Sequence, residues 1–187
     1  AHLYRITATV ARPQALQSLA LPVWIPGSYL VREFSKNLQN LVARQRSRVC
    51  ALRQLDKSHW EVACDPAHAL ELQYEVYALD NSVRTAWLDA QRGFFNGTSL
   101  FLQMQGLTDQ PHAVELVGGP QQLQWQVATG LTPVRVDRRG WGHYRAQDYD
   151  ALVDCPVEMG AFWSGSFVAG GVPHRMVVAG AAAGFDG

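Results

Sequence analysis

Apolar and polar residues alternate over several short segments of this chain, which is the pattern of β-strands with one buried face. The clearest segment is 69–78, where Leu70, Leu72, Tyr74 and Val76 share one face and mainly charged or polar residues take the other. Similar patterns predict strands over 2–10, 48–55, 59–64, 99–105, 114–117, 123–128, 165–168 and 174–179. Segment 37–44 fits either a helix or a strand, and we favour a strand because it leads directly into 48–55.

Gly, Pro, Asn and Asp residues separate these segments, and no long amphipathic helix interrupts them. Many short strands with regular turn signals predict an all-β fold. We expect a multi-stranded sandwich or saddle-like domain, mostly antiparallel, with at most short helical turns such as one that Asp148 would cap. The length of 187 residues suits one domain or a little more.

The stretch 21–34, L-P-V-W-I-P-G-S-Y-L-V-R-E-F, is rich in β-forming residues on both sides of Pro26-Gly27. Pro sets φ at the second position of a turn and Gly accepts the positive φ of the third, so 25–28 is predicted to be a type II turn. We expect a strand before this turn and an extended segment after it. A tryptophan so close to a fixed turn needs large packing partners, so Trp24 is expected to be buried.

Composition limits the classes of function. Hydrophobic residues make up 48% of the chain, and sixteen basic residues balance sixteen acidic ones, which argues against a nucleic-acid partner. No apolar run approaches the length of about 18 residues that a membrane span needs, and no signal peptide is visible. Cys50, Cys64 and Cys155 lack C-x-x-C spacing, and their odd number favours reduced thiols and a cytoplasmic location.

Two of these cysteines fall on a predicted hairpin. If residues 56–58 form a three-residue loop, paired residues have numbers that add up to 114, so that Arg53 faces Glu61 and Cys50 faces Cys64. Directly opposed residues are close to disulfide range. Two alternatives remain open: the thiols stay reduced, or a four-residue loop shifts the register and sends them to opposite faces.

No motif for catalysis, cofactor binding or metal binding is present. None of the six histidines begins an H-E-x-x-H motif, and no two of them lie four residues apart, which is the spacing that zinc peptidases use on a helix. Neither a G-x-S-x-G elbow nor a glycine-rich nucleotide loop occurs. We therefore predict no catalytic, cofactor-binding or metal-binding residue.

Three long segments carry a resemblance: 21–34, R-T-A-W-L-D-A-Q-R-G-F-F-N-G-T-S-L-F-L at 84–102, and D-Y-D-A-L-V-D-C-P-V-E-M-G-A-F at 148–162. In this order they resemble the N-terminal part of the glycyl aminopeptidase family. These are zinc peptidases with an N-terminal β domain, a thermolysin-like catalytic domain and a C-terminal PDZ domain. The resemblance covers nearly the whole chain but only part of such an enzyme, and in proteins of this kind a further stretch precedes the first residue of this sequence.

The resemblance implies a non-catalytic N-terminal domain of an enzyme that removes N-terminal residues, preferably Gly or Ala. Zinc and catalysis would belong to the missing catalytic domain, which is the expected partner, and the substrate of the complete enzyme would be a peptide. We expect a β-rich domain over 1–178 and a tail over 179–187, either a frayed end or the start of the catalytic domain. The domain would pack on the catalytic domain and shape the substrate cleft.

One polar segment is the candidate wall of that cleft, and it consists of Phe94, Phe95, Asn96, Gly97, Thr98 and Ser99. The alternative is a hairpin turn with local side-chain hydrogen bonds. Glu158, in V-E-M-G, invites comparison with the amine-binding G-x-M-E-N motif of aminopeptidase N-like enzymes. The leading Gly and the Asn are absent, so a strand that closes the domain explains this segment better.

A different class of function fits the same composition. The chain would then be a free-standing β-sandwich that binds a glycan or a protein through exposed aromatic residues such as Trp24, Trp87 or Trp163. The two hypotheses make different predictions for the reading frame beyond Gly187. A frame that continues into H-E-x-x-H supports the peptidase domain, whereas an early stop supports the binding module.

Overall fold

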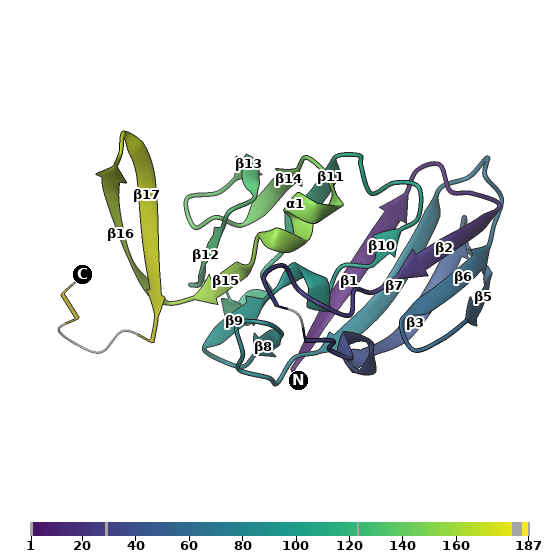
Figure 1. Ribbon diagram of the computed structural model, residues 1–187, viewed down its shortest axis with the longest axis horizontal. Helices are drawn as coiled ribbons and strands as arrows, with labels where there is room; N and C mark the ends of the chain where they lie inside the picture. The colour runs from purple at the N-terminus through teal and green to yellow at the C-terminus, as the bar shows by residue number, and fades with distance from the viewer. Residues whose placement is uncertain (1, 29, 123, 181–184, 187) are drawn as a thin grey trace.

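The computed structural model describes residues 2–28, 30–122, 124–180 and 185–186. These residues form seventeen β-strands, one short α-helix and three 3-10 helices, and every strand pair is antiparallel within five sheets (Figure 1). The all-β prediction is confirmed. No helix in these ranges is long and apolar enough to cross a membrane.

The first sheet has the order β1-β7-β3-β4. Its strands are β1 (Leu3–Val10), β7 (Leu70–Tyr77), β3 (Leu38–Gln45) and β4 (Arg48–Val49). The predicted inward residues of β7, which are Leu70, Leu72, Tyr74 and Val76, are all buried. Segment 38–45 is a strand, because it pairs with β7 and places Ala43 in the core.

The second sheet has the order β10-β2-β6-β5 and supplies further core residues, such as Leu19, Trp60 and Val62. Its strands are β10 (Gln103–Met104), β2 (Leu16–Ala20), β6 (His59–Ala63) and β5 (Ala51–Gln54). The predicted register of the β5–β6 hairpin is confirmed: Arg53 lies opposite Glu61, and the Nη2 to Oε2 distance is 2.9 Å.

The two cysteines beyond this hairpin are free thiols. Their backbone N–H groups do not bond to each other but to different segments: that of Cys50 donates to Ala43 O, and that of Cys64 donates to Ala15 O. The thiol of Cys64 donates to Gln14 O at 3.1 Å, and burial raises its pKa. The structure therefore agrees with the reduced alternative, although the register that would oppose the two residues is present.

Three further sheets complete the fold (Figure 1). One contains β11 (His112–Leu116), β14 (Gly142–Ala146) and β13 (Thr132–Val136), and another contains β12 (Gln126–Thr129), β15 (Val157–Gly160), β9 (Arg92–Phe95) and β8 (Ala86–Leu88). The last is a hairpin of β16 (Phe162–Ala169) and β17 (Val172–Ala179), which projects from one end of the molecule. The helices are η1 (Phe34–Asn37), η2 (Gly97–Ser99), η3 (Pro120–Gln122) and α1 (Tyr149–Asp154), the last capped by Asp148 as predicted.

A single hydrophobic cluster joins the four sheets other than the hairpin. Two buried tyrosines tie the middle of the chain to it by hydrogen bonds to backbone carbonyls. Tyr74 donates to Leu100 O at 2.8 Å, and Tyr149 donates to Phe101 O at 2.7 Å. These bonds hold the segment after η2 against both β7 and α1, which explains why the predicted strand 99–105 is reduced to Gln103–Met104.

Residues 21–28 and 30–33 form a loop rather than a pair of strands, and the burial of Trp24 was predicted wrongly. Trp24 is 56% exposed. The core takes Leu21 and Ile25 instead, so the residue next to Ile25 is directed outward. Residues 30–33 form no strand, Phe34 begins η1, and Tyr29 lies outside the described residues.

The turn at Pro26-Gly27 is confirmed. Ser28 N donates to Ile25 O at 3.1 Å, and Gly27 has a φ of +76°, as the third position of a type II turn requires. Of the predicted tail over 179–187, residues 181–184 and 187 lie outside the described ranges. The predicted boundary at 178 stays a prediction.

Replacing Gly27 with Val tests the turn. A Cβ there would meet no atom within 4 Å, so the cost comes from the backbone alone. Placing a β-branched residue at positive φ should cost about 1–3 kcal/mol, measured as the free energy of unfolding in urea. Gly27→Asn is the control, because Asn tolerates this conformation far better. Equal stability of the wild type and both variants would contradict the assigned turn.

Candidate functional site

The structure brings together two candidates that are far apart in the sequence. β9 pairs with β15, and within this pair Phe94 lies directly opposite Glu158. Opposed residues of an antiparallel pair point to the same face of the sheet. On the other side of β9, Trp87 of β8 also lies opposite Phe94. These three partly exposed side chains form one face of the sheet, which we call the β9 face.

Glu158 on the β9 face is held by a two-pronged ion pair. Arg92 donates from Nε to Oε1 at 2.8 Å and from Nη2 to Oε2 at 2.9 Å, and its Nη1 donates to Asn81 Oδ1 at 2.8 Å. The hydrogen bonds to Glu158 raise the pKa of Arg92. Both carboxylate oxygens of Glu158 are therefore engaged, and the residue lies within strand β15.

The guanidinium of Arg92 also covers an aromatic ring. Its Cζ lies 5.5 Å from the centroid of Phe94, within the range of a cation–π contact. Trp87 is fixed in turn, because its Nε1 donates to Asp89 Oδ2 at 3.1 Å. The β9 face therefore presents aromatic and charged side chains that are oriented by contacts with neighbouring residues.

Tyr4 supports the β9 face from beneath. Its hydroxyl donates to Trp87 O at 2.9 Å. Its ring makes an edge-to-face contact with the ring of Phe95, with 5.4 Å between the two ring centroids. Burial raises the pKa of Tyr4 well above its ordinary value, so the phenol stays protonated and can donate. The first strand of the chain thus positions a site formed about ninety residues later.

The rest of the candidate segment lies mainly inside the molecule. Asn96 caps the N-terminus of η2, and its Oδ1 accepts from Thr98 N at 3.2 Å and from Thr98 Oγ1 at 2.6 Å. Thr98 and Ser99 are buried. Gly97 packs on α1 so closely that a Cβ would lie 2.8 Å from Val153 Cα. The local hydrogen bonds of the turn alternative are present, but in a 3-10 helix between β9 and β10 rather than in a hairpin.

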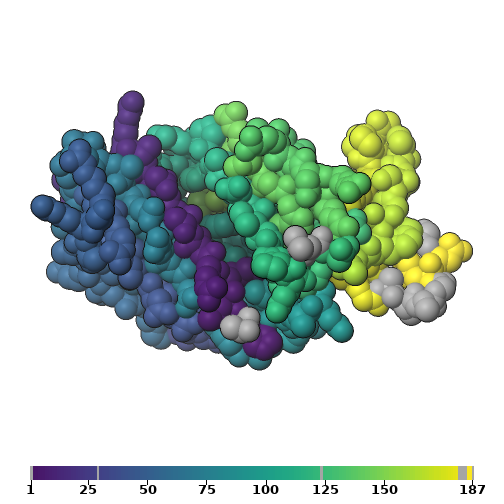
Figure 2. Space-filling model, turned by 180° about the vertical axis from the view of Figure 1, so that it is seen from behind, coloured from purple at the N-terminus to yellow at the C-terminus, as the bar shows by residue number. Residues whose placement is uncertain are grey.

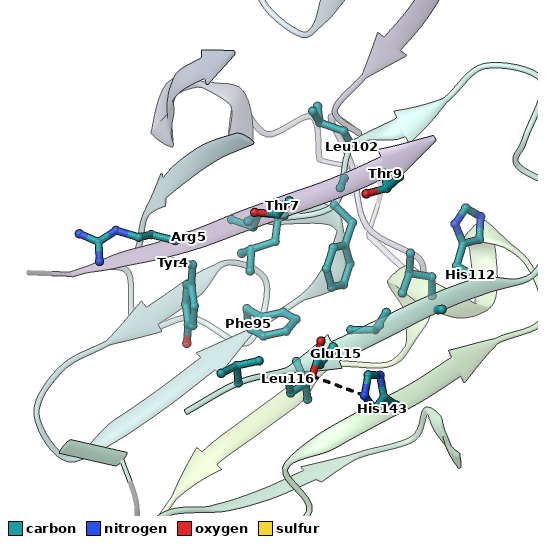
Figure 3. A pocket seen from close by; sticks show the side chains of 18 of the residues that line it. Tyr4, Arg5, Thr7, Thr9, Phe95, Leu102, His112, Glu115, Leu116 and His143 are labelled. Carbon is teal, nitrogen blue, oxygen red and sulfur yellow. Dashed lines mark ion pairs between the residues drawn. The ribbon is translucent and has the colours of Figure 1, made fainter. Parts of the chain in front are cut away.

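A separate groove of about 1290 Å³ lies between β1 and β11 (Figure 3). Phe95 and Leu102 are among its apolar lining residues. At its polar side, Glu115 Oε1 lies 3.4 Å from His143 Nε2. His112 also lines the groove, its Nε2 is buried with no hydrogen-bond partner among the described residues, and burial lowers its pKa. Sequence reasoning missed this groove because strands far apart along the chain form it.

Metal binding has no support in the described part of the chain, where no three His, Cys, Asp or Glu side chains come together in a possible ligand set. These residues do not fit a zinc ion. The described residues define an all-β domain with a fixed polar and aromatic face and a large groove.

Comparison with protein families matches residues 1–161 to the peptidase M61 N-terminal domain. The chain belongs to this family, and the resemblance inferred from the three sequence segments is confirmed. The match ends just before the β16–β17 hairpin. No curated protein matches the chain.

Solved structures resemble this chain to different degrees. An aminopeptidase N family protein from Idiomarina loihiensis is 40% identical, with a TM-score of 0.92 over 96% of this chain and 30% of that one. An M1 zinc metallopeptidase from Deinococcus radiodurans is 13% identical, with a TM-score of 0.49 over 97% of this chain and 44% of that one. The present chain thus spans 30% of the length of the first protein and 44% of the second.

The ion pair of the β9 face should stabilise the domain measurably. Glu158 is 15% exposed and Arg92 is 32% exposed, so Glu158→Gln leaves a partly buried guanidinium short of an acceptor and should cost about 1–3 kcal/mol. Glu61→Gln is the control, because its partner Arg53 is 75% exposed and such surface pairs contribute about 0–1 kcal/mol. Urea unfolding measures both, and equal losses would contradict a special role for the Arg92 pair.

Proposed function

We propose that this chain is the non-catalytic N-terminal domain of a zinc-dependent aminopeptidase that prefers N-terminal Gly or Ala. The family match supports the assignment to a peptidase. The Idiomarina loihiensis protein, an aminopeptidase N family member of which this chain spans 30%, supports a larger enzyme that contains such a domain. Zinc and the chemical step would belong to the other part of that enzyme.

The observation that carries this proposal is the β16–β17 hairpin. Opposed pairs place Trp163 with Val178, Gly165 with Met176, Phe167 with His174, and Ala169 with Val172 on one face. This face is apolar apart from His174, and Phe167 is 52% exposed on it. An isolated two-stranded hairpin is only marginally stable in water, and exposed apolar patches commonly mark interaction sites.

The hairpin therefore suits a docking element. Figure 1 shows it reaching away from the other sheets, beyond the part that the family model matches. We propose that its apolar face packs against the catalytic domain.

The wall of the substrate cleft remains a proposal for the β9 face. Of the six candidate residues, Phe94 and Asn96 keep partly exposed side chains, whereas Phe95, Gly97, Thr98 and Ser99 are buried and would support them. An aromatic ring backed by Arg92 offers a flat surface against which a peptide could lie. Phe94→Ala in the complete enzyme should raise KM for peptide substrates more than it lowers kcat.

The hairpin proposal is tested in the complete enzyme with two neighbouring residues on opposite faces. Phe167→Asp places a charge on the apolar face, and Val168→Asp, at a position that is 70% exposed, is the matched control. If Phe167 is buried at the contact, the first variant should lose about 1.5–3 kcal/mol of stability and the second almost none. In the 187-residue chain neither variant should change the unfolding midpoint appreciably.

Two results would contradict the hairpin contact. One is equal behaviour of both variants in the complete enzyme. The other is a loss caused by Phe167→Asp that is just as large in the 187-residue chain, because that loss would come from the hairpin itself. This second measurement is necessary because the rings of Phe167 and His174 stack within the hairpin, with 5.1 Å between their centroids. Phe167→Asp therefore also removes a contact inside the hairpin.

The 187-residue chain should hold no stoichiometric zinc and should hydrolyse no Gly- or Ala-arylamide, because its described residues offer no ligand set. Elemental analysis after dialysis and an arylamidase assay measure both properties. One tightly bound zinc per chain would overturn the assignment of a non-catalytic domain. A reading frame that ends shortly after Gly187 would favour the free-standing binding module, for which the exposed Trp24 is the strongest candidate contact.

A further inference from the structure

Two cysteines meet at the open end of the β5–β6 hairpin. The ladder ends with Ala51 directly opposite Ala63, so the next position along both strands holds Cys50 and Cys64. Both are free thiols, partly buried against the hydrophobic cluster. Opposed residues point to the same face of a sheet, so this register directs the two side chains to one side.

The hydrogen-bond pattern of the hairpin defines this position further. Leu55 N donates to His59 O at 2.9 Å, so the odd-numbered pairs of the hairpin are the hydrogen-bonded ones, because such pairs alternate along an antiparallel ladder. The pair of Cys50 and Cys64 is even-numbered and thus non-hydrogen-bonded. Opposed Cα atoms in such a pair lie about 4.5 Å apart, inside the range of roughly 4.4–6.8 Å found for disulfides.

The backbone bonds of the two cysteines agree with this assignment. At a non-hydrogen-bonded pair, the N–H groups point away from the partner strand. Cys50 N donates to Ala43 O of β3 at 2.9 Å, and Cys64 N donates to Ala15 O, just before β2, at 3.0 Å. Each cysteine is therefore held from its outer side by the segment that flanks the hairpin there, and the two side chains stay opposed.

Gln45 links the surroundings of the two thiols. Its Oε1 lies 3.8 Å from Cys50 Sγ and accepts from Asp65 N, in the residue after Cys64, at 2.8 Å. Burial first, and the charge of Cys50 second, raise the pKa of Cys64. A thiolate influences a neighbouring group in this way only over a short distance, so the shift agrees with two thiols that lie close together.

We propose that Cys50 and Cys64 form a reversible modification site, at which a low-molecular-weight disulfide oxidises the two thiols to a cross-strand disulfide. In the first step, the thiolate of one cysteine attacks a sulfur of the small disulfide RSSR, which forms a mixed disulfide and releases one RS⁻. The thiolate of the other cysteine then attacks the protein sulfur of the mixed disulfide, and the second RS⁻ leaves. The two thiol protons end on the released RS⁻ groups, and the two electrons that the protein loses reduce RSSR to two RSH.

The disulfide would fasten the place where the chain crosses from the first sheet to the second. Cys50 follows β4 of the first sheet and precedes β5 of the second, and Cys64 follows β6. Bond formation gives up the thiol contacts with Gln14 O and Gln45 Oε1, which is a small loss because thiols are weak donors. A Cα separation at the short end of the disulfide range strains the bond and makes it easier to reduce, so reducing thiols would restore the pair.

The cysteine pair is separate from the proposed docking hairpin. Figure 2 shows the blue part of the chain, which contains β5, at the opposite end of the molecule from the yellow β16–β17 hairpin. The modification therefore does not depend on the proposed function.

Cys155 provides a control within the same chain. It is also a free thiol, and burial raises its pKa as well. It follows α1 and packs against Gly130, where an added Cβ would lie 3.1 Å from its Sγ. Because no cysteine is opposed to it in the sheets, it should not join an internal disulfide.

Incubating the reduced 187-residue chain with oxidised glutathione tests the proposal. Digestion without a reducing agent, followed by mass spectrometry, should find the Cys50 peptide linked to the Cys64 peptide, while Cys155 carries at most one glutathione. The midpoint of thermal unfolding should rise by about 3–10 °C, because a bond between positions 50 and 64 restricts the unfolded chain. Dithiothreitol should reverse this rise.

Serine variants assign the effect to the pair. Cys50→Ser and Cys64→Ser each leave one thiol of the pair, which should take up one glutathione without any rise in the midpoint. Cys155→Ser keeps the pair and should show the same linked peptides and the same rise as the wild type.

Three outcomes would overturn the proposal. Glutathione on both Cys50 and Cys64 without a link between them would show that the two thiols do not meet. A pair that stays reduced in the folded chain, but becomes linked once urea unfolds it, would show that the fold holds the thiols apart. A linked product with a lowered midpoint would show that the bond distorts the fold instead of fastening it.

Discussion

The structure depends on β7, which is hydrogen-bonded to β1 over its whole length and to β3 along its other edge. Its ladders with β1 and β3 bring together three segments that are distant in sequence. Its inward side chains, from Leu70 to Val76, are almost completely removed from water. Tyr74 extends this constraint, because its hydroxyl is bonded to Leu100 O and so fixes where the chain passes between η2 and β10. Apolar burial and backbone pairing thus act at the same place.

The β9 face inherits its geometry from this framework. β1 is held by β7, and Tyr4 on β1 donates to the carbonyl of Trp87 beneath the face. The pairing of β9 with β15 then sets Phe94 beside Glu158 and within reach of Arg92. Because each of these groups is held by another, the surface that they present is ordered by its own contacts, and such ordering would lower the entropic cost of any binding there.

The groove and the β16–β17 hairpin share a physical property: each leaves groups exposed that a protein usually covers. At the groove these are backbone N–H and C=O groups on two facing edges, and on the hairpin they are apolar side chains such as Phe167. Open strand edges can pair with another strand, whereas an exposed apolar face favours contact with a complementary apolar surface.

Local patterns in the sequence determined several strands, one turn and the family of this protein. Strict alternation of apolar and polar residues in 70–77 and 59–63 specified both strands. The short loop at 56–58 specified the pairing of Arg53 with Glu61, because the loop length fixes the register of a hairpin. The Pro-Gly pair specified its turn, since φ preferences act within a few residues. The three longer motifs specified the family.

Only the tertiary structure decided the rest. Trp24 faces water because Leu21 and Ile25 occupy the core, a competition that neighbouring residues cannot reveal. The joining of Phe94 and Glu158, and the groove between β1 and β11, depend on which strands become neighbours. That choice is made by long-range pairing and shared burial, whose partners lie about sixty to one hundred residues apart along the chain.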